Sequence, residues 1–394
     1  MSVLDFLFVV PGGVLAASAL YLLVPAVVAL FYRKEERRSR GETDVVVLIP
    51  AHDEESTVSA CIRSLQEQEY PLDRLEIVVI ADNCTDETAR VAADAGAEVL
   101  VRDVPDARGK GRALAWAIDQ LLARPQPPSA VVVMDADSTP DSRFLTEIVN
   151  RFEEGASAVQ GESLLLEDGS AEQALRSAAF LLVNRARPTG RSMLGLPAGL
   201  AGNGMLFGRT LLAEHPWTAF SSTEDVEYGL RLRAAGVKPV FARGAIVWSQ
   251  AAPHGHAADV QQLRWEGGKL HLARTQIPRL VAQAFRDRRP SLLDAAAELA
   301  IPPLGYLAAA SAAISATGVF LAWLDGLSAW AVVPALCALA AIPVYVLVGL
   351  VAGRAPASAY RALLHAPGFV VRKAFKAHRL ARFRPDSWVR TERR

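Results

Sequence analysis

Two aspartates, Asp135 and Asp137, follow an apolar run with only Ala136 between them. The run, residues 130–134, is rich in valine and indicates a buried strand. Alternate residues on an extended backbone face the same way, so we expect both carboxylates to converge on one ligand. Two such carboxylates repel each other unless a cation offsets them, and hard divalent ions bind carboxylate and phosphate oxygens together. The pair therefore predicts a site for a metal ion and a diphosphate.

A second acidic pair, Glu224 and Asp225, opens a stretch with helical spacing, STEDVEYGLRLR, for which Ser221 or Ser222 is the expected N-cap. Acids in the first turn of a helix complement the helix dipole whatever else they do. Position alone therefore leaves two interpretations open, a pair that stabilises the helix start and a pair that takes part in chemistry.

Gln261, Arg264 and Trp265 are spaced to lie on one face of a later helix. An amphipathic helix packed against a core would show the same spacing, so the pattern does not decide between binding and packing. The stretch 199–212 is glycine-rich, which is typical of a loop.

These residues need a scaffold, and the sequence between about 42 and 290 predicts one. Strands are expected at 45–50, 76–80, 97–101 and 130–134, and helices at 55–68, 87–95 and 111–122. This alternation predicts an open, mostly parallel α/β sheet flanked by helices. Such sheets bind ligands at the carboxyl ends of their strands, where this chain has Glu54, Asp82 and Lys110. Single polar residues at such ends, Asp53 and Asp86 among them, can also be helix caps or turn residues.

Several classes of protein are disfavoured. Lys and Arg together equal Asp and Glu at 42 each, so the net charge gives no support for a nucleic-acid partner. The sequence has neither a GxxxxGK[ST] phosphate loop nor a GxGxxG after the first strand. A sugar-nucleotide pyrophosphorylase would carry a glycine-rich loop where this chain has PAHDEE. The three cysteines lie far apart without a CxxC pair, which indicates neither a disulfide framework nor a zinc site.

Apolar residues make up 51% of the 394 residues, which indicates membrane segments. Three stretches are long enough to cross a bilayer: 14–32, lengthened by 4–10 beyond a break at 11–13, then about 301–324 and 327–351. The first lacks the basic n-region of a cleaved signal peptide, which favours a retained anchor. Basic residues follow the first and the last stretch, so we expect both flanks in the cytoplasm, the turn at 325–326 outside and an outside N-terminus.

The order of the motifs VVVLIPAHDEE, VVIADNCTDET, GKGRAL, VVMDADS, STEDVEYGLRLR and QQLRW resembles the family 2 glycosyltransferases with a GT-A fold. Within that family the chain looks most like the membrane-embedded branch that includes cellulose, hyaluronan and chitin synthases. The resemblance covers about residues 45–265. It implies a membrane-anchored, metal-dependent, inverting transferase that takes its sugar from a nucleotide sugar, with UDP as the expected nucleotide.

The resemblance also implies roles for individual residues. Asp135 would lie near the ribose, and Asp137 would bind Mg²⁺ or Mn²⁺. Asp225 would be the catalytic base, with Glu224 beside it near the acceptor. The further implied residues are Ala51, Glu54, Asp82 and Lys110 in the nucleotide-sugar pocket, and Gln261, Arg264 and Trp265 at the diphosphate and the acceptor. One departure is Asp53, where the family usually has asparagine.

The end of the chain, FRPDSWVRTERR, contains Trp388, Thr391 and Arg393 at the spacing aromatic-x-x-Thr-x-basic. This resembles the gating-loop motif Phe-x-Val-Thr-x-Lys of cellulose synthases, which closes over the bound nucleotide. Arg390 stands in place of the valine, and the motif lies at the chain end instead of between membrane helices. A basic tail without a gating role is the alternative.

The predicted organisation is therefore an anchor (1–32), a basic linker (33–43), a cytoplasmic catalytic domain (44–250), acceptor-side and membrane-interface helices (251–300), two membrane helices (301–351) and a cytoplasmic amphipathic tail (352–394). The expected product is a β-linked polysaccharide or a lipid-linked glycan made at the cell membrane. The alternatives are a single-sugar glycolipid transferase resembling the ceramide glucosyltransferases and a non-catalytic scaffold subunit of an export complex. Expected partners are the donor, the acceptor, the bilayer, and polysaccharide-assembly subunits or a second copy of the chain, with no nucleic acid.

Overall fold

A computed structural model describes residues 2–34, 41–250 and 256–381 of the chain. These residues form two compact units. The sheet unit comprises the described parts of 34–166 and 196–295, and the helical unit comprises those of 1–33, 167–195 and 296–383. Each unit is described by itself below.

The sheet unit is built on one sheet in the strand order β3-β2-β1-β4-β7-β6-β8-β5. Its strands are β1 (Val45–Ala51), β2 (Leu75–Asp82), β3 (Glu98–Arg102), β4 (Ala130–Val133), β5 (Ser138–Pro140), β6 (Ala158–Leu165), β7 (Met205–Gly208) and β8 (Val240–Ser249). The pairs β1–β2, β2–β3, β1–β4 and β6–β8 are parallel, whereas β7 runs antiparallel to both β4 and β6, and β5 antiparallel to β8. The carboxyl ends of β1, β2 and β4 therefore meet at one edge of the sheet.

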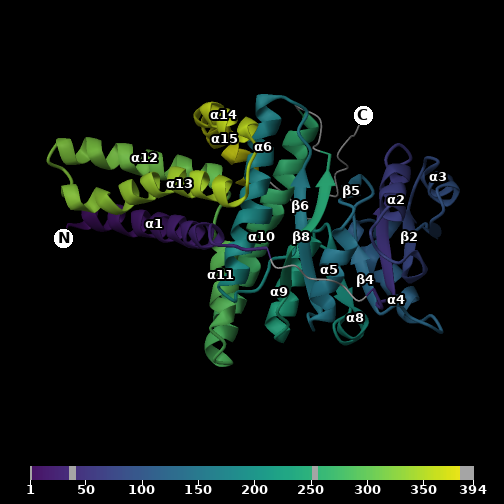
Figure 1. The fold of residues 1–394 in the computed structure, drawn as a ribbon. Helices are drawn as coiled ribbons and strands as arrows, with labels where there is room; N and C mark the ends of the chain where they lie inside the picture. Colours follow the sequence, from purple (N-terminus) through teal and green to yellow (C-terminus); the bar gives the residue numbers. More distant parts are fainter. Residues whose placement is uncertain (1, 35–40, 251–255, 382–394) are drawn as a thin grey trace. The chain divides into compact units, whose positions relative to one another are not determined.

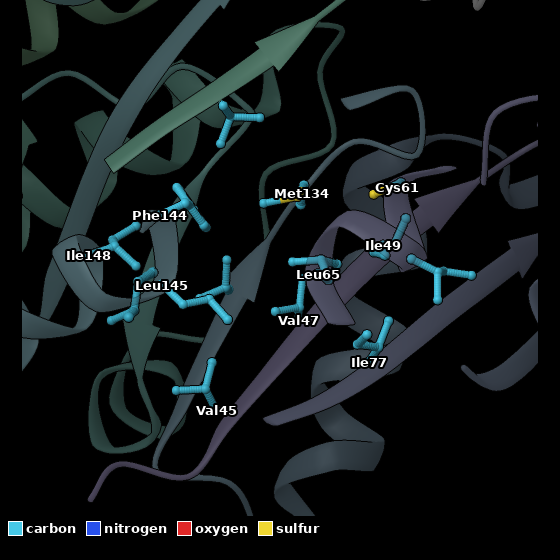
Figure 2. Close-up of a cluster of buried hydrophobic side chains, with 14 of the residues drawn as sticks. Val45, Val47, Ile49, Cys61, Leu65, Ile77, Met134, Phe144, Leu145 and Ile148 are labelled. Atoms are coloured by element: carbon cyan, nitrogen blue, oxygen red, sulfur yellow. The ribbon is translucent and has the colours of Figure 1, made fainter. Parts of the chain in front are cut away.

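Both faces of this sheet are covered, because apolar residues on its central strands alternate between two cores. Val47 and Ile49 of β1 belong to one buried cluster, and Val46 and Leu48 belong to another. This is the two-residue period of a strand buried on both faces. Figure 2 shows the first cluster, where Val47 and Ile49 lie near Leu65.

The helices of the sheet unit are α2 (Val58–Gln66), α3 (Thr88–Asp94), α4 (Lys110–Leu122), α5 (Phe144–Glu153), α8 (Arg209–Glu214), α9 (Glu224–Ala235) and α10 (His256–Arg286). Residues of α2 and α5 fill the first cluster, and residues of α4 fill the second. The predicted fold class, a GT-A-type open and mostly parallel sheet flanked by helices with apolar helices towards both chain ends, is confirmed.

Three helical segments of the helical unit are long and apolar enough to cross a membrane: Val3–Ala29, Leu304–Trp323 and Ala329–Ala352. They correspond to α1, to α12 and to α13 (Val333–Ala352) with the 3₁₀ turn (Ala329–Val332) before it. Figure 1 draws α1 in purple beside α13 in green. All three stretches were predicted from their apolar composition.

The predicted break at residues 11–13 is wrong, because α1 continues through Pro11. The glycines that suggested a break have a packing role instead. A Cβ added at Gly12 would lie 3.0 Å from the backbone nitrogen of Ala335 on α13, so glycine allows the two helices to approach closely.

Residues 167–195 follow β6 in the chain and belong to the helical unit. They form α6 (Ala171–Leu181), a π-helical turn (Leu182–Ala186) and α7 (Arg187–Met193). A Cβ added at Gly190 of α7 would lie 1.7 Å from the carbonyl oxygen of Pro25 on α1. The unit is completed by α14 (Ala357–Ala362) and α15 (Ala366–Ala381), while α11 (Ser291–Ala300) contains the boundary between the units. The functional domain boundaries predicted from the sequence stay a prediction.

Candidate active site

The carboxylate pair lies in a tight turn directly after β4. The backbone N–H of Ser138 donates to the carbonyl oxygen of Asp135 at 3.1 Å, so Asp135 to Ser138 form a turn and not the expected extended strand. Both aspartates nevertheless act on one neighbour, the buried Cys61 of α2. Burial, together with the charges of Asp137 and Asp135, raises the pKa of the Cys61 thiol to about 12. The thiol is therefore protonated, and the turn offers oxygen donors, which suit a hard divalent cation.

Lys110 connects this turn to the second acidic pair. Its Nζ lies 2.6 Å from Oδ1 of Asp135 and 3.9 Å from Oε1 of Glu224. It also donates to the carbonyl oxygen of Gly202 at 2.5 Å. Burial acts to lower the pKa of Lys110, but the charges of Asp135 and Glu224 outweigh it, and the pKa lies above its ordinary value. Lys110 is therefore a half-buried cation shared by two acidic groups.

Glu224, which is buried, and Asp225, which is half-buried, lie in the first turn of α9. Burial, together with the charge of Glu224, raises the pKa of Asp225 to about 7. Burial likewise raises the pKa of Glu224, against the charges of Lys110 and of Arg264. A carboxyl group that titrates near neutral pH is suited to proton transfer.

The helix start differs from its predicted form. The N-cap is Thr223 rather than Ser221 or Ser222. The hydroxyl oxygens of all three are buried without a hydrogen-bond partner among the described residues. A Cβ added at Gly268 of α10 would lie 2.7 Å from Cγ2 of Thr223, so α10 covers the start of α9 at this point.

Gly111 allows α4 to approach the same region. A Cβ at this position would lie 2.2 Å from the carbonyl oxygen of Ala219 and 3.3 Å from Cβ of Glu224. Any other residue at position 111 would push the segment before α9 away from α4, which carries Lys110. The GKG motif therefore supplies both the cation and the space that the cation needs.

The predicted pocket residues on β1 and β2 lie at the same edge of the sheet. Ala51 ends β1, and Asp82 ends β2. Asp82 is buried, and its Oδ1 accepts from Nη1 of Arg102 at 2.5 Å and from Nδ2 of Asn83 at 2.8 Å. Glu54 precedes α2, and its Oε2 accepts from the Thr57 hydroxyl at 2.8 Å.

A third acidic group lies beside this pocket. Asp53, Cys84 and Asp86 bring potential metal-ligand atoms within 4.8 Å of one another. The carboxylates already accept backbone bonds, because Thr85 N–H donates to Asp53 at 2.6 Å and Thr88 N–H donates to Asp86 at 3.0 Å. These bonds are those of turn and cap residues.

The residues predicted on the QQLRW segment lie on α10. Arg264 is close enough for its charge to act on Glu224. The Trp265 side chain is 40% exposed, and Gln261 is partly buried. Trp388, Thr391 and Arg393 lie outside the described residues. The structure thus brings Lys110, Asp135 and Glu224 into contact, but these contacts do not test the roles predicted for them.

Residues 43–268 match the family described as "Glycosyltransferase like family 2". The chain is 26% identical over 267 residues to the probable glycosyltransferase YdaM of Bacillus subtilis (strain 168), covering 63% of this chain and 60% of that protein. It is 28% identical over 195 residues to the beta-monoglucosyldiacylglycerol synthase of Nostoc sp. (strain PCC 7120), covering 48% and 41%. The chain thus spans less than two thirds of the length of either relative.

Among solved structures, the chain resembles the mannosyltransferase PcManGT from Pyrobaculum calidifontis, which is in complex with GDP-Man and Mn²⁺. The TM-score is 0.49 and the sequence identity 18%, and the similarity covers 86% of this chain and 98% of that one. The family match rests on the sequence and covers more than half of the 394 residues. The chain therefore belongs to the glycosyltransferase-like family 2.

Proposed function

We propose that this glycosyltransferase transfers a sugar from a UDP-sugar, with inversion at the anomeric carbon, to a hydroxyl group of a lipid-linked glycan or a growing β-linked polysaccharide. One observation supports the proposal most. Lys110 contacts the Asp135 carboxylate on one side and lies near Glu224 on the other, so the Asp135–Ser138 turn and the first turn of α9, which carries Asp225, lie at one site.

In the proposed reaction, Asp225 accepts the proton of the acceptor hydroxyl while the hydroxyl oxygen attacks the anomeric carbon. The bond between that carbon and the diphosphate oxygen breaks, and the nucleoside diphosphate leaves with the bonding electron pair. Attack from the face opposite the leaving group inverts the anomeric configuration. The proton stays on Asp225 until it passes to solvent.

Asp137, with Asp135 beside it, would hold the Mg²⁺ or Mn²⁺ ion. A bound divalent ion neutralises charge that develops on the departing diphosphate. Lys110 is positioned to add a second positive charge, and Arg264 would contribute a guanidinium group, whose fork can bind two phosphate oxygens. The exposed ring of Trp265 offers a stacking surface for an acceptor sugar.

The acceptor is proposed to be held at a membrane. The three apolar helical segments support this, and so does the similarity to a relative named for a diacylglycerol product. That relative also favours the second candidate, transfer of one sugar to a glycolipid. The presence of Asp137 and Asp225 argues against a non-catalytic scaffold, because a scaffold would need neither.

Membranes that contain the protein should be incubated with a panel of labelled nucleotide sugars, with and without EDTA. The expected result is a labelled product from one UDP-sugar, lost on chelation and restored by Mg²⁺ or Mn²⁺, and absent from membranes with Asp137→Ala. Mass analysis then separates a polymer from a single-sugar lipid. Transfer that continues undiminished in EDTA would contradict the metal role, and transfer from GDP-sugars alone would contradict the proposed donor.

A further inference from the structure

The turn from Asp135 to Ser138, called the carboxylate turn below, is contacted at both of its ends by one buried side-chain amide, that of Asn203. Its Oδ1 accepts from the backbone N–H of Asp135 at 3.2 Å. Its Nδ2 donates to the Ser138 hydroxyl at 2.8 Å. The turn that contains both aspartates runs from 135 to 138, so a single side chain fixes its first and its last residue.

The same amide ties this turn to the end of β8. Nδ2 of Asn203 also donates to the Ser249 hydroxyl at 3.0 Å, and the Ser138 and Ser249 oxygens lie 3.1 Å apart. Ser138 and Ser249 are themselves partners in the β5–β8 register. Asn203 is only 3% exposed, so its donors and acceptor are used within the protein.

The backbone around Asn203 is held in turn by Gln160, which is buried on β6. Nε2 of Gln160 donates to the Asn203 carbonyl at 2.8 Å, and its Oε1 accepts from Ala201 N–H at 2.8 Å. The flanking Gly202 and Gly204 have φ of +76° and +64°, which favour glycine. This arrangement holds the backbone of Asn203 in place, so its side chain can hold the turn in place.

The segment 202–203 also touches the rest of the site. The Gly202 carbonyl accepts from Lys110, and a Cβ added at Gly202 would lie 3.0 Å from Oδ2 of Asp225. Two consecutive residues therefore contact the carboxylate turn, the shared lysine and the candidate base. A shift of this segment would change all three positions together.

We infer that Asn203 is a positioning residue, which fixes the Asp135–Ser138 turn so that its carboxylates are held ready for a divalent ion and at a set distance from Asp225. The inference rests on the proposed function, because the turn has to bind a metal for its position to matter in this way. Partners that orient metal ligands typically change metal affinity about 10–100-fold when they are lost.

The test measures metal binding directly on the purified full-length chain. The electron paramagnetic resonance signal of free Mn²⁺ falls when the ion binds, and it is titrated with and without UDP. We expect Asn203→Ala to weaken apparent Mn²⁺ affinity in the presence of UDP about 10–100-fold. Binding of UDP in EDTA should stay within a few-fold of the wild type.

Gln68 supplies a matched control, because it is a similarly buried amide with the same number of bonds. Its Oε1 accepts from Leu145 N–H, and its Nε2 donates to the carbonyl oxygens of Ser64 and Asp141. Gln68→Ala should lower the melting temperature about as much as Asn203→Ala does, without a comparable loss of Mn²⁺ affinity. Equal losses of affinity in both variants would reduce Asn203 to a general stabilising residue and overturn the inference.

A double-mutant cycle shows whether Asn203 and Ser138 act together. Because the two residues share one hydrogen bond, the loss in Asn203→Ala/Ser138→Ala should be smaller than the sum of the single losses. If Asn203→Ala does not fold, the variant Ser249→Ala is measured in its place. This variant removes only one hydrogen-bond partner of the Asn203 amide. Unchanged Mn²⁺ affinity in the folded variants would refute the inference alone, whereas a wild-type chain that binds no Mn²⁺ with UDP would refute the proposed metal site itself.

Discussion

Lys110 shows at the scale of a residue how one charge can serve two functions. Without its cation, the Asp135 and Glu224 carboxylates would face each other across a partly buried space, where unpaired charges are costly. Its ion pair with Asp135 and its proximity to Glu224 therefore stabilise the site. A diphosphate bound at the turn would offer the same ammonium group a stronger set of acceptors, so Lys110 can support both the free and the bound site.

Replacement of Asp225 by asparagine removes the proposed proton acceptor and retains the shape of the side chain. We expect turnover to fall about a hundredfold or more, since general-base catalysis typically contributes this much. Affinity for the nucleotide sugar should change little. Turnover and donor binding are measured separately, the latter by titration with UDP. Glu227→Gln is the control, because Glu227 lies in the same turn and its Oε2 accepts from Ser221 N–H, which glutamine can also do. Near-normal turnover in Asp225→Asn would leave this residue as a helix-start carboxylate only.

The raised pKa of Asp225 predicts a pH dependence of activity and of stability. The base acts only when ionised, so kcat/KM should rise with pH and level off above about 7. For stability the sign is opposite, because the folded state holds this proton more tightly than the unfolded state does. The stabilising contribution is complete below the ordinary pKa of 3.8 and is lost as pH rises through about 7.

Asp225→Asn has no such proton, so it should melt at a higher temperature than the wild type at pH 8 and lose most of that advantage at pH 5. Thermal unfolding of both proteins across this range tests the expectation. A constant difference in melting temperature at all pH values would mean that Asp225 does not titrate in this window.

At the scale of the elements, close contacts through glycine decide how the helical unit packs. Gly190 of α7 lies against the Pro25 carbonyl of α1, whereas a Cβ at Gly13 of α1 would have no atom within 4 Å. Both glycines are inside helices, where alanine would otherwise be favourable by about 1 kcal/mol. Alanine substitutions at Gly190 and Gly13 therefore separate the effect of packing from that of intrinsic helix propensity.

Gly190→Ala should lower stability by about 1–3 kcal/mol or prevent folding, because the added methyl group forces α7 and α1 apart. Gly13→Ala should be neutral or slightly stabilising. Melting temperatures of the two variants in one detergent make the comparison. Equal melting temperatures would mean that α7 does not pack on α1 as described.

Helices and strands with a clear pattern of apolar residues could be predicted from the sequence, and contacts between residues far apart in the sequence could not. The apolar run at 45–50 predicted the strand β1, and the longer apolar runs predicted the three long helices. The Asp135–Ser138 turn was expected to be extended, because the sequence does not show where the β4 ladder ends. The break at Pro11 was expected because local propensity does not include α13, against which Gly12 packs.

The site shows the same limit. Asp135, Asp137 and Lys110 were predicted from their places near strand ends, and Glu224 and Asp225 from a helix start and the family resemblance. The sequence pattern does not distinguish Asn203 within its glycine-rich stretch, and its position between Gly202 and Gly204 is the one local signal. Its role depends on Ser138, 65 residues earlier, and on Ser249, 46 residues later. The membership of 167–195 in the helical unit was equally hidden, since α6 and α7, with 11 and 7 residues, are too short to resemble a membrane segment.

At the scale of the whole molecule, the distribution of charge predicts which side of the membrane holds the sheet unit. Arg33, Lys34, Arg37 and Arg38 follow α1 in the sequence, and the region 354–381 after α13 contains basic residues but neither Asp nor Glu. The turn between α12 and α13 carries only Asp325 as a charge. Positive charge stays on the cytoplasmic side, so three crossings with an outside N-terminus satisfy both flanks.

Reporters fused after residue 40, after residue 326 and at the C-terminus should therefore report cytoplasm, outside and cytoplasm in that order. Each site is tested with one reporter active only in the cytoplasm and one active only outside. A variant in which the four basic residues at 33, 34, 37 and 38 are replaced by asparagine tests whether their positive charge sets the orientation in the membrane. If their charge sets the orientation, the fusion after residue 40 should move partly to the outside. An outside signal from the unaltered fusion after residue 40 would separate Asp135, Lys110 and Asp225 from the cytoplasmic supply of nucleotide sugar, and the proposed donor would then be wrong.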